Sequence, residues 1–379
     1  MKDPRFTQLS RTLVHHSMKV TPGDKVLVEA FDIPTDFTVE LIKTIADAGG
    51  HPIVSTYHQA VLRQLYRSAS REQMETIGLV EKLRMESVQC YCGIRGSHNI
   101  SETSDVPKEK MELYEKHWWN PVHSNIRVPK TRWVVLRWPH PSMAQNAGMS
   151  TEAFEDFYFQ VCAGLDYAKM ARASQPLVDL MRATNEVHIT GPGTDLRFSI
   201  KGIGAMPCNG GCNIPDGETY SCPTLDSADG VVQFNAETLY RGTVFNRVKL
   251  KLSNGKVIEA SCDGADNTKK LNEVLDADEG ARRIGEFAIG YNPYVLRPMK
   301  DILFDEKIAG SFHFTPGNAY EDCGNGNKSQ IHWDMVCIQR PEYGGGEICF
   351  DGKLIRKDGL FVLPELLDLN PDRLGSASA

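Results

Sequence analysis

Apolar residues in the first third of the chain alternate between two spacings. A helical repeat covers residues 6–14, and a short apolar run typical of a buried strand follows at 25–30. Helical spacing returns over residues 37–45, and a second strand-like run occupies 51–57. The pattern predicts a strand–helix–strand unit over residues 25–57. Its two strands are expected to be parallel, because a right-handed crossover is the usual connection of this kind.

The same texture continues to about residue 180. "ESVQCYCGI" (86–94) and "RWVVLRWP" (132–139) are apolar runs that extend the predicted sheet. Ser70 stands three residues before a glutamine, the spacing of a capping box at a helix start. One long helix is predicted to begin at Ser150 and to run to Pro176. No strand leads into a G-x-G-x-x-G turn, so the sequence gives a nucleotide-binding role little support.

The second half has the texture of β structure. Apolar and polar residues alternate on both sides of a Gly-Pro-Gly turn in 186–200, and "RVKLKLSNGKVIEA" contains Asn254-Gly255, a strong hairpin signal. A brief helix is expected in "ADNTKKLNEVLD", and the final "GSASA" is expected to be a tail. We therefore predict an α/β N-terminal domain, a connecting helix and an α+β C-terminal catalytic domain with mostly antiparallel strands. Their predicted ranges are 1–145, 146–184 and 185–379.

Composition narrows the class of protein. The 379 residues are 41% hydrophobic and 24% charged, with a formal net charge of -7. An acidic chain without basic runs argues against nucleic acid or an anionic membrane as the main partner. No stretch approaches the ~20 apolar residues of a membrane span, and "MKDPRFTQLS" lacks the apolar centre of a signal peptide. Ten scattered cysteines suggest buried free thiols, so we expect a cytoplasmic protein.

Two pairs of cysteines are spaced closely enough to be possible metal ligands. Cys90 and Cys92 lie two apart in a strand-like run, and Cys208 and Cys212 lie in the Gly-rich "CNGGCNIP". Neither pair has the C-x-x-C spacing of a structural zinc site. Metal binding by these cysteines is therefore not favoured.

Better candidate ligands stand beside turn-forming residues in the second half. They are two glutamates, two histidines and an aspartate, the oxygen and nitrogen donors that a pair of zinc-like ions takes: Glu218, Glu286, His313, His332 and Asp334. In "SQIHWDMV", a strand would place His332 and Asp334 on one face. From the residues alone, that face is either part of a metal site or an ordinary strand with two satisfied polar groups.

Four motifs resemble those of a known family, the thermophilic-type metalloaminopeptidases of the peptidase M29 family. "NIPDGE" and "GEFAIG" resemble its two glutamate motifs, and "GSFHFTPGNAY" and "GNKSQIHWDMV" resemble its histidine, tyrosine and His-x-Asp motifs. "GDKVLVEA" and "AGMSTEAFEDFYF" extend the resemblance into the first half. "GYNP" and "TPG" depart from the family's usual Gly-Thr-Asn and Ala-Leu-Gly, and we expect these departures to affect the shape of the substrate pocket.

The resemblance implies both a site and an activity. It makes Glu218, Glu286, His313, His332 and Asp334 the ligands of two divalent metal ions (Zn, Co or Mn), with Glu286 as the bridging carboxylate. It makes Tyr320 a catalytic group beside the metals, with Glu218 or Glu286 as general base. The implied protein is a homodimeric aminopeptidase that removes the N-terminal residue of small peptides with a metal-activated water.

A rival interpretation uses three of the same residues. His313, His332 and Asp334 form a 2-His-1-carboxylate set, which suits a mononuclear Fe(II) ring-cleaving dioxygenase acting on a dihydroxypyridine-like substrate. Such dioxygenases share the fold of the resembled family. Glu218 and Glu286 favour the hydrolase, since a mononuclear iron site needs neither. A metal-binding scaffold without catalysis is disfavoured because Tyr320 is also present.

Overall fold

The computed structural model of the protein describes residues 3–375, so most of the predicted "GSASA" tail lies outside the described residues. The chain forms two compact units, which we describe separately. Unit 1 comprises the residues up to Leu165 together with Gly210–Ile214, and unit 2 comprises Asp166–Asn209 and the residues from Pro215 onward. The predicted domain boundaries at 145 and 185 stay a prediction.

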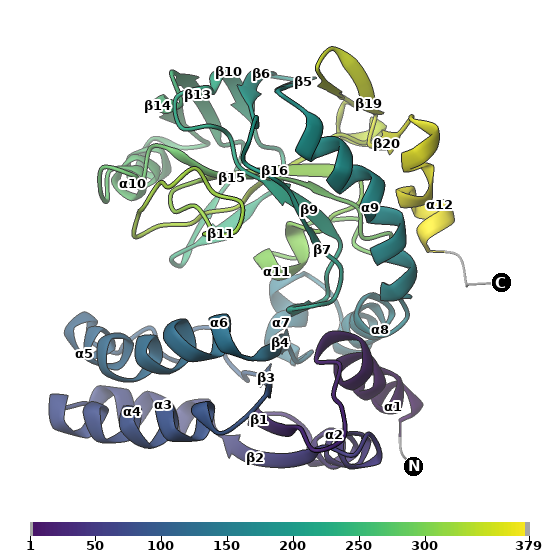
Figure 1. The fold of residues 1–379 in the computed structure, drawn as a ribbon. Coiled ribbons are helices and arrows are strands. Elements are labelled where there is room, and N and C mark those ends of the chain that lie inside the picture. The colour runs from purple at the N-terminus through teal and green to yellow at the C-terminus, as the bar shows by residue number, and fades with distance from the viewer. Residues whose placement is uncertain (1–2, 376–379) are drawn as a thin grey trace. The chain divides into compact units, whose positions relative to one another are not determined.

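Unit 1 is built on a five-stranded sheet of order β2-β1-β3-β4-β8 whose neighbours are all parallel (Figure 1). Its strands are β1 (Lys25–Phe31), β2 (His51–Tyr57), β3 (Cys90–Arg95), β4 (Arg132–Arg137) and the short β8 (Asn213–Ile214). The predicted strand–helix–strand unit is confirmed, with helix α2 (Thr35–Asp47) joining β1 to β2. The edge strand β8 comes from the second half of the sequence, which the texture of the chain did not indicate.

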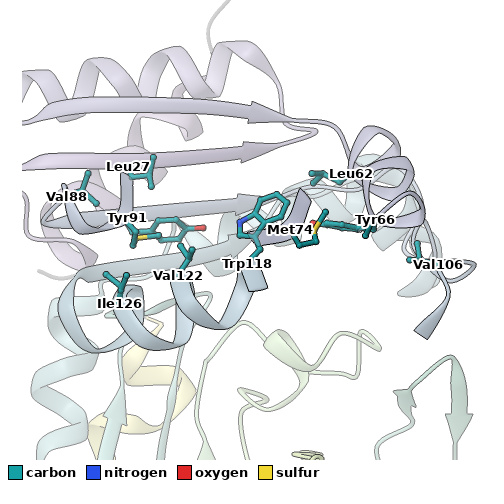
Figure 2. Close-up of a cluster of buried hydrophobic side chains, with 12 residues drawn as sticks. Leu27, Leu62, Tyr66, Met74, Val88, Tyr91, Val106, Trp118, Val122 and Ile126 are labelled. Atoms are coloured by element: carbon teal, nitrogen blue, oxygen red, sulfur yellow. The ribbon is translucent and has the colours of Figure 1, made fainter. Parts of the chain in front are cut away.

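The side chains of the central strands alternate between two cores. Leu27 of β1 and Tyr91 of β3 point into a cluster with Val122 and Ile126, which Figure 2 shows packed against these strands. Val26 and Val28 are fully buried on the opposite face. A parallel sheet buried on both faces needs such continuous apolar strands, which is why these strands were recognisable in the sequence.

The helices of unit 1 confirm most of the predicted boundaries. Ser70 caps α4 through a capping box with Gln73, as the spacing predicted. The helical segments are α1 (Pro4–Arg11), η1 (Thr12–Ser17), α2, α3 (Gln59–Arg67), α4 (Arg71–Glu86), α5 (Lys108–Tyr114), the π-helical η2 (Glu115–Arg127), α6 (Val128–Lys130), α7 (Pro141–Asn146) and α8 (Thr151–Cys162).

The predicted single helix from Ser150 to Pro176 is wrong. The structure has two helices, α8 and α9 (Tyr167–Ala183), separated around Gly164. The side chain of Asp166 accepts a hydrogen bond from the Lys169 backbone N–H and so begins a new helix. Pro176 lies inside α9 and does not end it. The apolar spacing continued across the break, so periodicity alone could not locate it.

Unit 2 contains two larger antiparallel sheets. One has the order β14-β13-β10-β6-β5-β18-β19-β20, and the other has the order β17-β16-β15-β9-β7. The strands of the first are β5 (Glu186–Gly191), β6 (Thr194–Ser199), β10 (Asp229–Gln233), β13 (Lys249–Ser253), β14 (Lys256–Ser261), β18 (Glu347–Phe350), β19 (Lys353–Lys357) and β20 (Leu360–Phe361). Those of the second are β7 (Met206–Cys208), β9 (Glu218–Ser221), β15 (Ile284–Gly290), β16 (Ser311–Pro316) and β17 (Met335–Ile338).

Both predicted hairpins of unit 2 are confirmed. β5 and β6 pair across the Gly-Pro-Gly turn, and β13 and β14 pair across Asn254-Gly255, where both residues have positive φ. The predicted brief helix is α10 (Ala265–Leu275). The remaining elements of unit 2 are the pair β11 (Thr238–Tyr240) and β12 (Thr243–Phe245), α11 (Ile302–Asp305), η3 (Pro341–Tyr343), η4 (Pro364–Leu369) and α12 (Pro371–Leu374).

Aromatic side chains fill the space between the two large sheets of unit 2. The ring of Phe198 on β6 lies 4.9 Å from that of Phe287 on β15 and 5.1 Å from that of Phe314 on β16. One face of the β17-β16-β15-β9-β7 sheet is thereby sealed with apolar groups. Polar residues on these strands must use the other face. No helix in residues 3–375 is both long and apolar enough to cross a bilayer.

Candidate metal centre

Three of the five candidate ligands lie on adjacent strands. Glu218 begins β9, Glu286 lies in β15 and His313 lies in β16. In the register of the sheet, Ala288 pairs with His313 and Gly290 pairs with Glu218. Because Glu286 shares a face with residues 288 and 290, all three candidate ligands lie on the face opposite the apolar core.

The strand between these ligands has small residues on the ligand face. Ala288 and Gly290 share the ligand face with Glu286, while Phe287 points into the core. A Cβ on Gly290 would lie 2.7 Å from the Ile308 carbonyl oxygen and 2.9 Å from that of Glu306. Glycine at 290 therefore lets the segment 306–308 approach the sheet beside the ligands.

The segment with His332 and Asp334 reaches the same face without being a regular strand. β17 starts only at Met335, and His332 makes an isolated bridge to Gly317, so the predicted strand over "SQIHWDMV" is wrong in extent. The two side chains nevertheless converge, with His332 Nε2 3.1 Å from Asp334 Oδ1. Between them, Trp333 turns away and stacks on Tyr240 with ring centroids 4.3 Å apart.

Glu286 lies at the centre of the group. Its Oε1 is 3.2 Å from His313 Nε2, and its Oε2 is 3.2 Å from His332 Nε2. Two sets of possible ligand atoms follow, one from Glu218, Glu286 and His313 and one from Glu286, His332 and Asp334; within each set the atoms lie within 4.8 Å of one another. Glu286 belongs to both sets through different oxygens. This is the arrangement that a bridging carboxylate requires.

Several polar atoms of this group are buried without a hydrogen-bond partner. They include Glu218 Oε2 and His313 Nδ1. Glu218 is 4% exposed and His313 is 1% exposed. Unsatisfied atoms of this kind cost free energy unless another group completes them.

The electrostatics of the ligand group are those of carboxylates around imidazoles. Burial would lower the pKa of His313, but Glu218 and Glu286 outweigh it and raise the pKa to about 10. Burial is likewise outweighed by Asp334 and Glu286 at His332, whose pKa rises to about 12. Burial acts to raise the pKa of Glu286 and Asp334, but the two histidines hold both below their usual range. In the protein alone, both imidazoles are therefore protonated at neutral pH.

Tyr320 lies at the solvent side of this group. Its side chain is 47% exposed, and its ring centroid is 4.9 Å from that of His332 and 5.4 Å from that of Tyr220. The phenol is thus close to a candidate ligand and remains open to a small molecule arriving from solvent.

Residues that sequence reasoning missed support the ligands from behind. Thr315 Oγ1 donates a hydrogen bond of 2.7 Å to Asp334 Oδ1. Tyr291, from the departing "GYNP" motif, is buried and donates to the Glu218 backbone carbonyl at 2.6 Å. This change from the family's usual motif therefore holds the strand of the candidate ligand Glu218, a role that the sequence did not indicate. The one sequence signal for such support would have been a hydroxyl residue that pairs with a candidate ligand on the neighbouring strand, as Thr315 does.

A buried lysine was also missed. Lys307 Nζ lies 2.7 Å from Glu218 Oε1 and 3.7 Å from Asp216 Oδ1, and it also pairs with Glu306. Burial would lower its pKa, but the carboxylates around it, Glu218 foremost, raise the pKa well above the ordinary value. In the sequence, Lys307 stands in "DEKIAG", a charge-rich stretch that is typical of an exposed loop.

Of the four cysteines weighed as ligands, Cys208 alone belongs to a set of possible ligand atoms. Cys90 and Cys92 are buried free thiols in unit 1. Cys208, paired with Glu218 in the β7–β9 register, comes within 4.8 Å of Asp216 and Glu218 ligand atoms.

Comparison with known proteins places this geometry in a family. Residues 2–354 match the family described as thermophilic metalloprotease (M29). The chain is 26% identical over 285 residues to aminopeptidase T of Thermus aquaticus (64% of this chain, 66% of that protein). It is 32% identical over 274 residues to aminopeptidase T of Thermus thermophilus (61% and 66%). The alignments thus span just under two thirds of these relatives.

Solved structures agree on the fold. The wild-type AmpT structure from Thermus thermophilus matches with a TM-score of 0.78 at 22% identity, covering 95% of this chain and 99% of that one. A 2,5-dihydroxypyridine dioxygenase from Pseudomonas putida matches with a TM-score of 0.61 at 13% identity, covering 96% and 98%. The mixed α/β fold with antiparallel sheets is therefore shared by both. Since the family match spans nearly the whole chain, this protein belongs to the M29 family of thermophilic metalloproteases.

Proposed function

We propose that the protein is a metal-dependent aminopeptidase that hydrolyses the N-terminal residue from small peptides. The observation that carries the proposal is the double engagement of Glu286, whose two oxygens face two different ligand sets. Its family membership and the aminopeptidase names of its relatives support the same activity.

The ligand group fits the metal that the family implies. Glu218, Glu286, His313, His332 and Asp334 supply only oxygen and imidazole donors, the set that zinc, cobalt or manganese takes. Glu218 Oε2 is a buried acceptor without a hydrogen-bond partner, and the ring nitrogens of His313 and His332 would become acceptors for divalent ions once they lose their protons. We propose two ions that share Glu286.

The chain's own residues would then divide the work. Bound divalent ions supply a water of lowered pKa and polarise the scissile carbonyl. Glu286 holds the two ligand sets together, and Asp334 is fixed by Thr315. Glu218 has one oxygen held by Lys307, so its other oxygen faces the site as ligand or general base. Tyr320 is placed to donate a hydrogen bond to the oxyanion that develops on the substrate.

A second candidate function is the Fe(II) ring-cleaving dioxygenase. His313, His332 and Asp334 would be its 2-His-1-carboxylate set, and a dioxygenase has the same fold. Against it stands Glu218, a buried carboxylate with an unpartnered oxygen facing His313, for which a mononuclear iron site has no use. We therefore place the hydrolase first.

Metal analysis joined to an activity assay separates the two. The purified protein would be assayed on leucine p-nitroanilide before and after chelation, then with Zn²⁺, Co²⁺, Mn²⁺ or Fe²⁺ restored. Two ions per chain with restored hydrolysis would support the aminopeptidase. A single iron, with oxygen uptake on a dihydroxypyridine and no peptide hydrolysis, would replace it with the dioxygenase.

Assembly and location are further parts of the proposal. We propose a homodimer in the cytoplasm, in keeping with the resemblance and with the free thiols at all ten cysteine positions, which lie within the described residues. Light scattering on the purified protein tests the dimer. A monomeric mass with full activity would contradict it.

A further inference from the structure

Lys307 is a buried cation held by carboxylates. Its side chain is 1% exposed, and its ammonium lies 2.7 Å from Glu218 Oε1 and 3.7 Å from Asp216 Oδ1, with Glu306 as a third partner. Burying an ammonium is costly unless charges of opposite sign surround it. The three carboxylate partners of Lys307 meet that condition.

One of these carboxylates is also a proposed metal ligand. Glu218 Oε1 accepts from Lys307, whereas Glu218 Oε2 lies 3.7 Å from His313 Nδ1 and has no hydrogen-bond partner. The two oxygens of Glu218 thus face different cations, one supplied by the chain and one that remains to be bound. Because the ammonium of Lys307 occupies one oxygen of Glu218, a single oxygen is left to bind a metal ion.

The same ammonium lies at a third set of possible ligand atoms. Cys208, Asp216 and Glu218 place a sulfur and two carboxylate oxygens within 4.8 Å of one another. Lys307 contacts both of those carboxylates. It therefore neutralises the charge that would otherwise attract an ion there.

The backbone fixes where this ammonium lies. The Asn292 N–H donates to the Lys307 carbonyl at 2.9 Å, and the segment 306–308 approaches β15 closely because residue 290 is glycine. Lys307 is thus tethered to the segment that directly follows β15, the strand that carries Glu286. A flexible surface lysine would have no such constraint.

We propose that Lys307 is a positioning residue that acts as a built-in cation: it confines Glu218 to one oxygen toward the shared site and prevents metal binding at Cys208, Asp216 and Glu218. The chain then holds two ions and excludes a third. This inference rests on the proposed function, because it takes Glu218 as a ligand of the dinuclear site.

Binding of cobalt(II) tests the inference through the number of ions per chain and through the absorption spectrum. In the full-length wild type we expect two ions per chain and no thiolate-to-cobalt charge-transfer absorption. Lys307→Ala should bind a third ion and gain that absorption, because Cys208 becomes a ligand. Lys307→Arg, which keeps the cation, should restore the count of two. Adding Cys208→Ser to Lys307→Ala should abolish the new absorption.

Controls separate this inference from the proposed function. Lys251→Ala removes a lysine of an exposed pair in the same unit, 2.7 Å from Glu259, and should leave the count at two. If the wild type binds two ions that Glu286→Gln loses, the proposed site stands. If Lys307→Ala then binds two ions or fewer and shows no thiolate absorption, the inference is overturned.

Folding of the variant is a separate concern, since three carboxylates, two of them buried, would lose their cation. Should Lys307→Ala fail to fold, Glu306→Gln/Lys307→Ala removes one carboxylate together with the ammonium and retains the Cys208 set. The same count and spectrum then decide. A folded double variant without a third ion would also overturn the inference.

Discussion

Each unit buries a glutamate on a central strand, and the two glutamates have opposite properties. Glu29 on β1 of unit 1 is 7% exposed, and Glu286 on β15 of unit 2 is 3% exposed. Burial raises the pKa of Glu29, which accepts a hydrogen bond of 2.7 Å from the Tyr91 hydroxyl. Burial acts on Glu286 too, but the imidazoles of His313 and His332 lower its pKa.

The difference shows that burial alone does not make a carboxylate a metal ligand. At Glu29, burial outweighs the hydrogen bond from the Tyr91 hydroxyl, so the neutral form of that carboxyl is favoured. The two histidines require a charged Glu286 between them. Within residues 3–375, Glu286 belongs to two sets of possible ligand atoms and Glu29 belongs to none.

Replacing each glutamate should give the largest contrast. Glu286→Gln should lower turnover on a peptide substrate by roughly a thousandfold, because a bridging ligand or general base is lost. Glu29→Gln should leave turnover within about twofold, since an amide replaces a carboxyl that belongs to none of the sets of possible ligand atoms in residues 3–375. Steady-state kinetics and metal content measure both. Equal losses in the two variants would show that general disruption of a buried strand is the cause.

Metal binding at the Glu286 group should depend steeply on pH. Ions bind neutral imidazole, but the pKa is about 10 at His313 and about 12 at His332 in the protein alone. Each ion must therefore displace a proton at neutral pH, and affinity should rise about tenfold per pH unit per displaced proton. Calorimetry in buffers of different ionisation enthalpy measures the protons released. A pH-independent affinity between 6 and 9 would contradict the raised pKa values.

The raised pKa values of the two histidines also determine how the stability of the metal-free protein changes with pH. A histidine with a raised pKa stabilises the metal-free fold fully below its unfolded value of about 6.5, and that stabilisation is lost as pH rises through the folded value. For His313 the loss begins near pH 6.5 and is nearly complete at about pH 10, and thermal melts across this range measure it. Metal-loaded protein should lack this alkaline loss, because its imidazoles are already neutral.

A smaller effect on metal affinity is expected when a residue that supports a proposed ligand is changed. Thr315→Val removes the hydroxyl that donates to Asp334 at 2.7 Å and keeps a similar shape. Loss of such an outer hydrogen bond usually lowers metal affinity about 10- to 100-fold. Competition with a chelator measures the change, and Thr194→Val on β6 is the matched control. An unchanged affinity in Thr315→Val would mean that the sheet alone orients Asp334.

The sequence predicted the two units unequally well. The strands of unit 1 were recognisable because a parallel sheet buried on both faces needs unbroken apolar runs. The β5–β6 and β13–β14 hairpins of unit 2 were recognisable from their turns. The split between α8 and α9 was missed because a cap at Asp166 decides it locally while the apolar period continues.

The ligands could be named, but their supports could not. Motif resemblance supplied Glu218, Glu286 and His313, and their assignment as ligands stays a proposal. Lys307 and Thr315 come near them only through strand register and the close approach at Gly290. Pairing between distant strands is a property of the folded sheet and leaves no local pattern in the chain. The supporting residues therefore required the structure.

Trp333 gives the molecule an optical reporter. Of the five tryptophans, four lie between positions 118 and 138, in unit 1, and Trp333 alone belongs to unit 2. Its indole stacks on Tyr240 and donates to Thr238 Oγ1 at 3.2 Å, while its backbone joins His332 to Asp334. A protein with the other four replaced by phenylalanine would fluoresce from one indole, on the residue between two proposed ligands. Its emission would follow events at that segment without an added label.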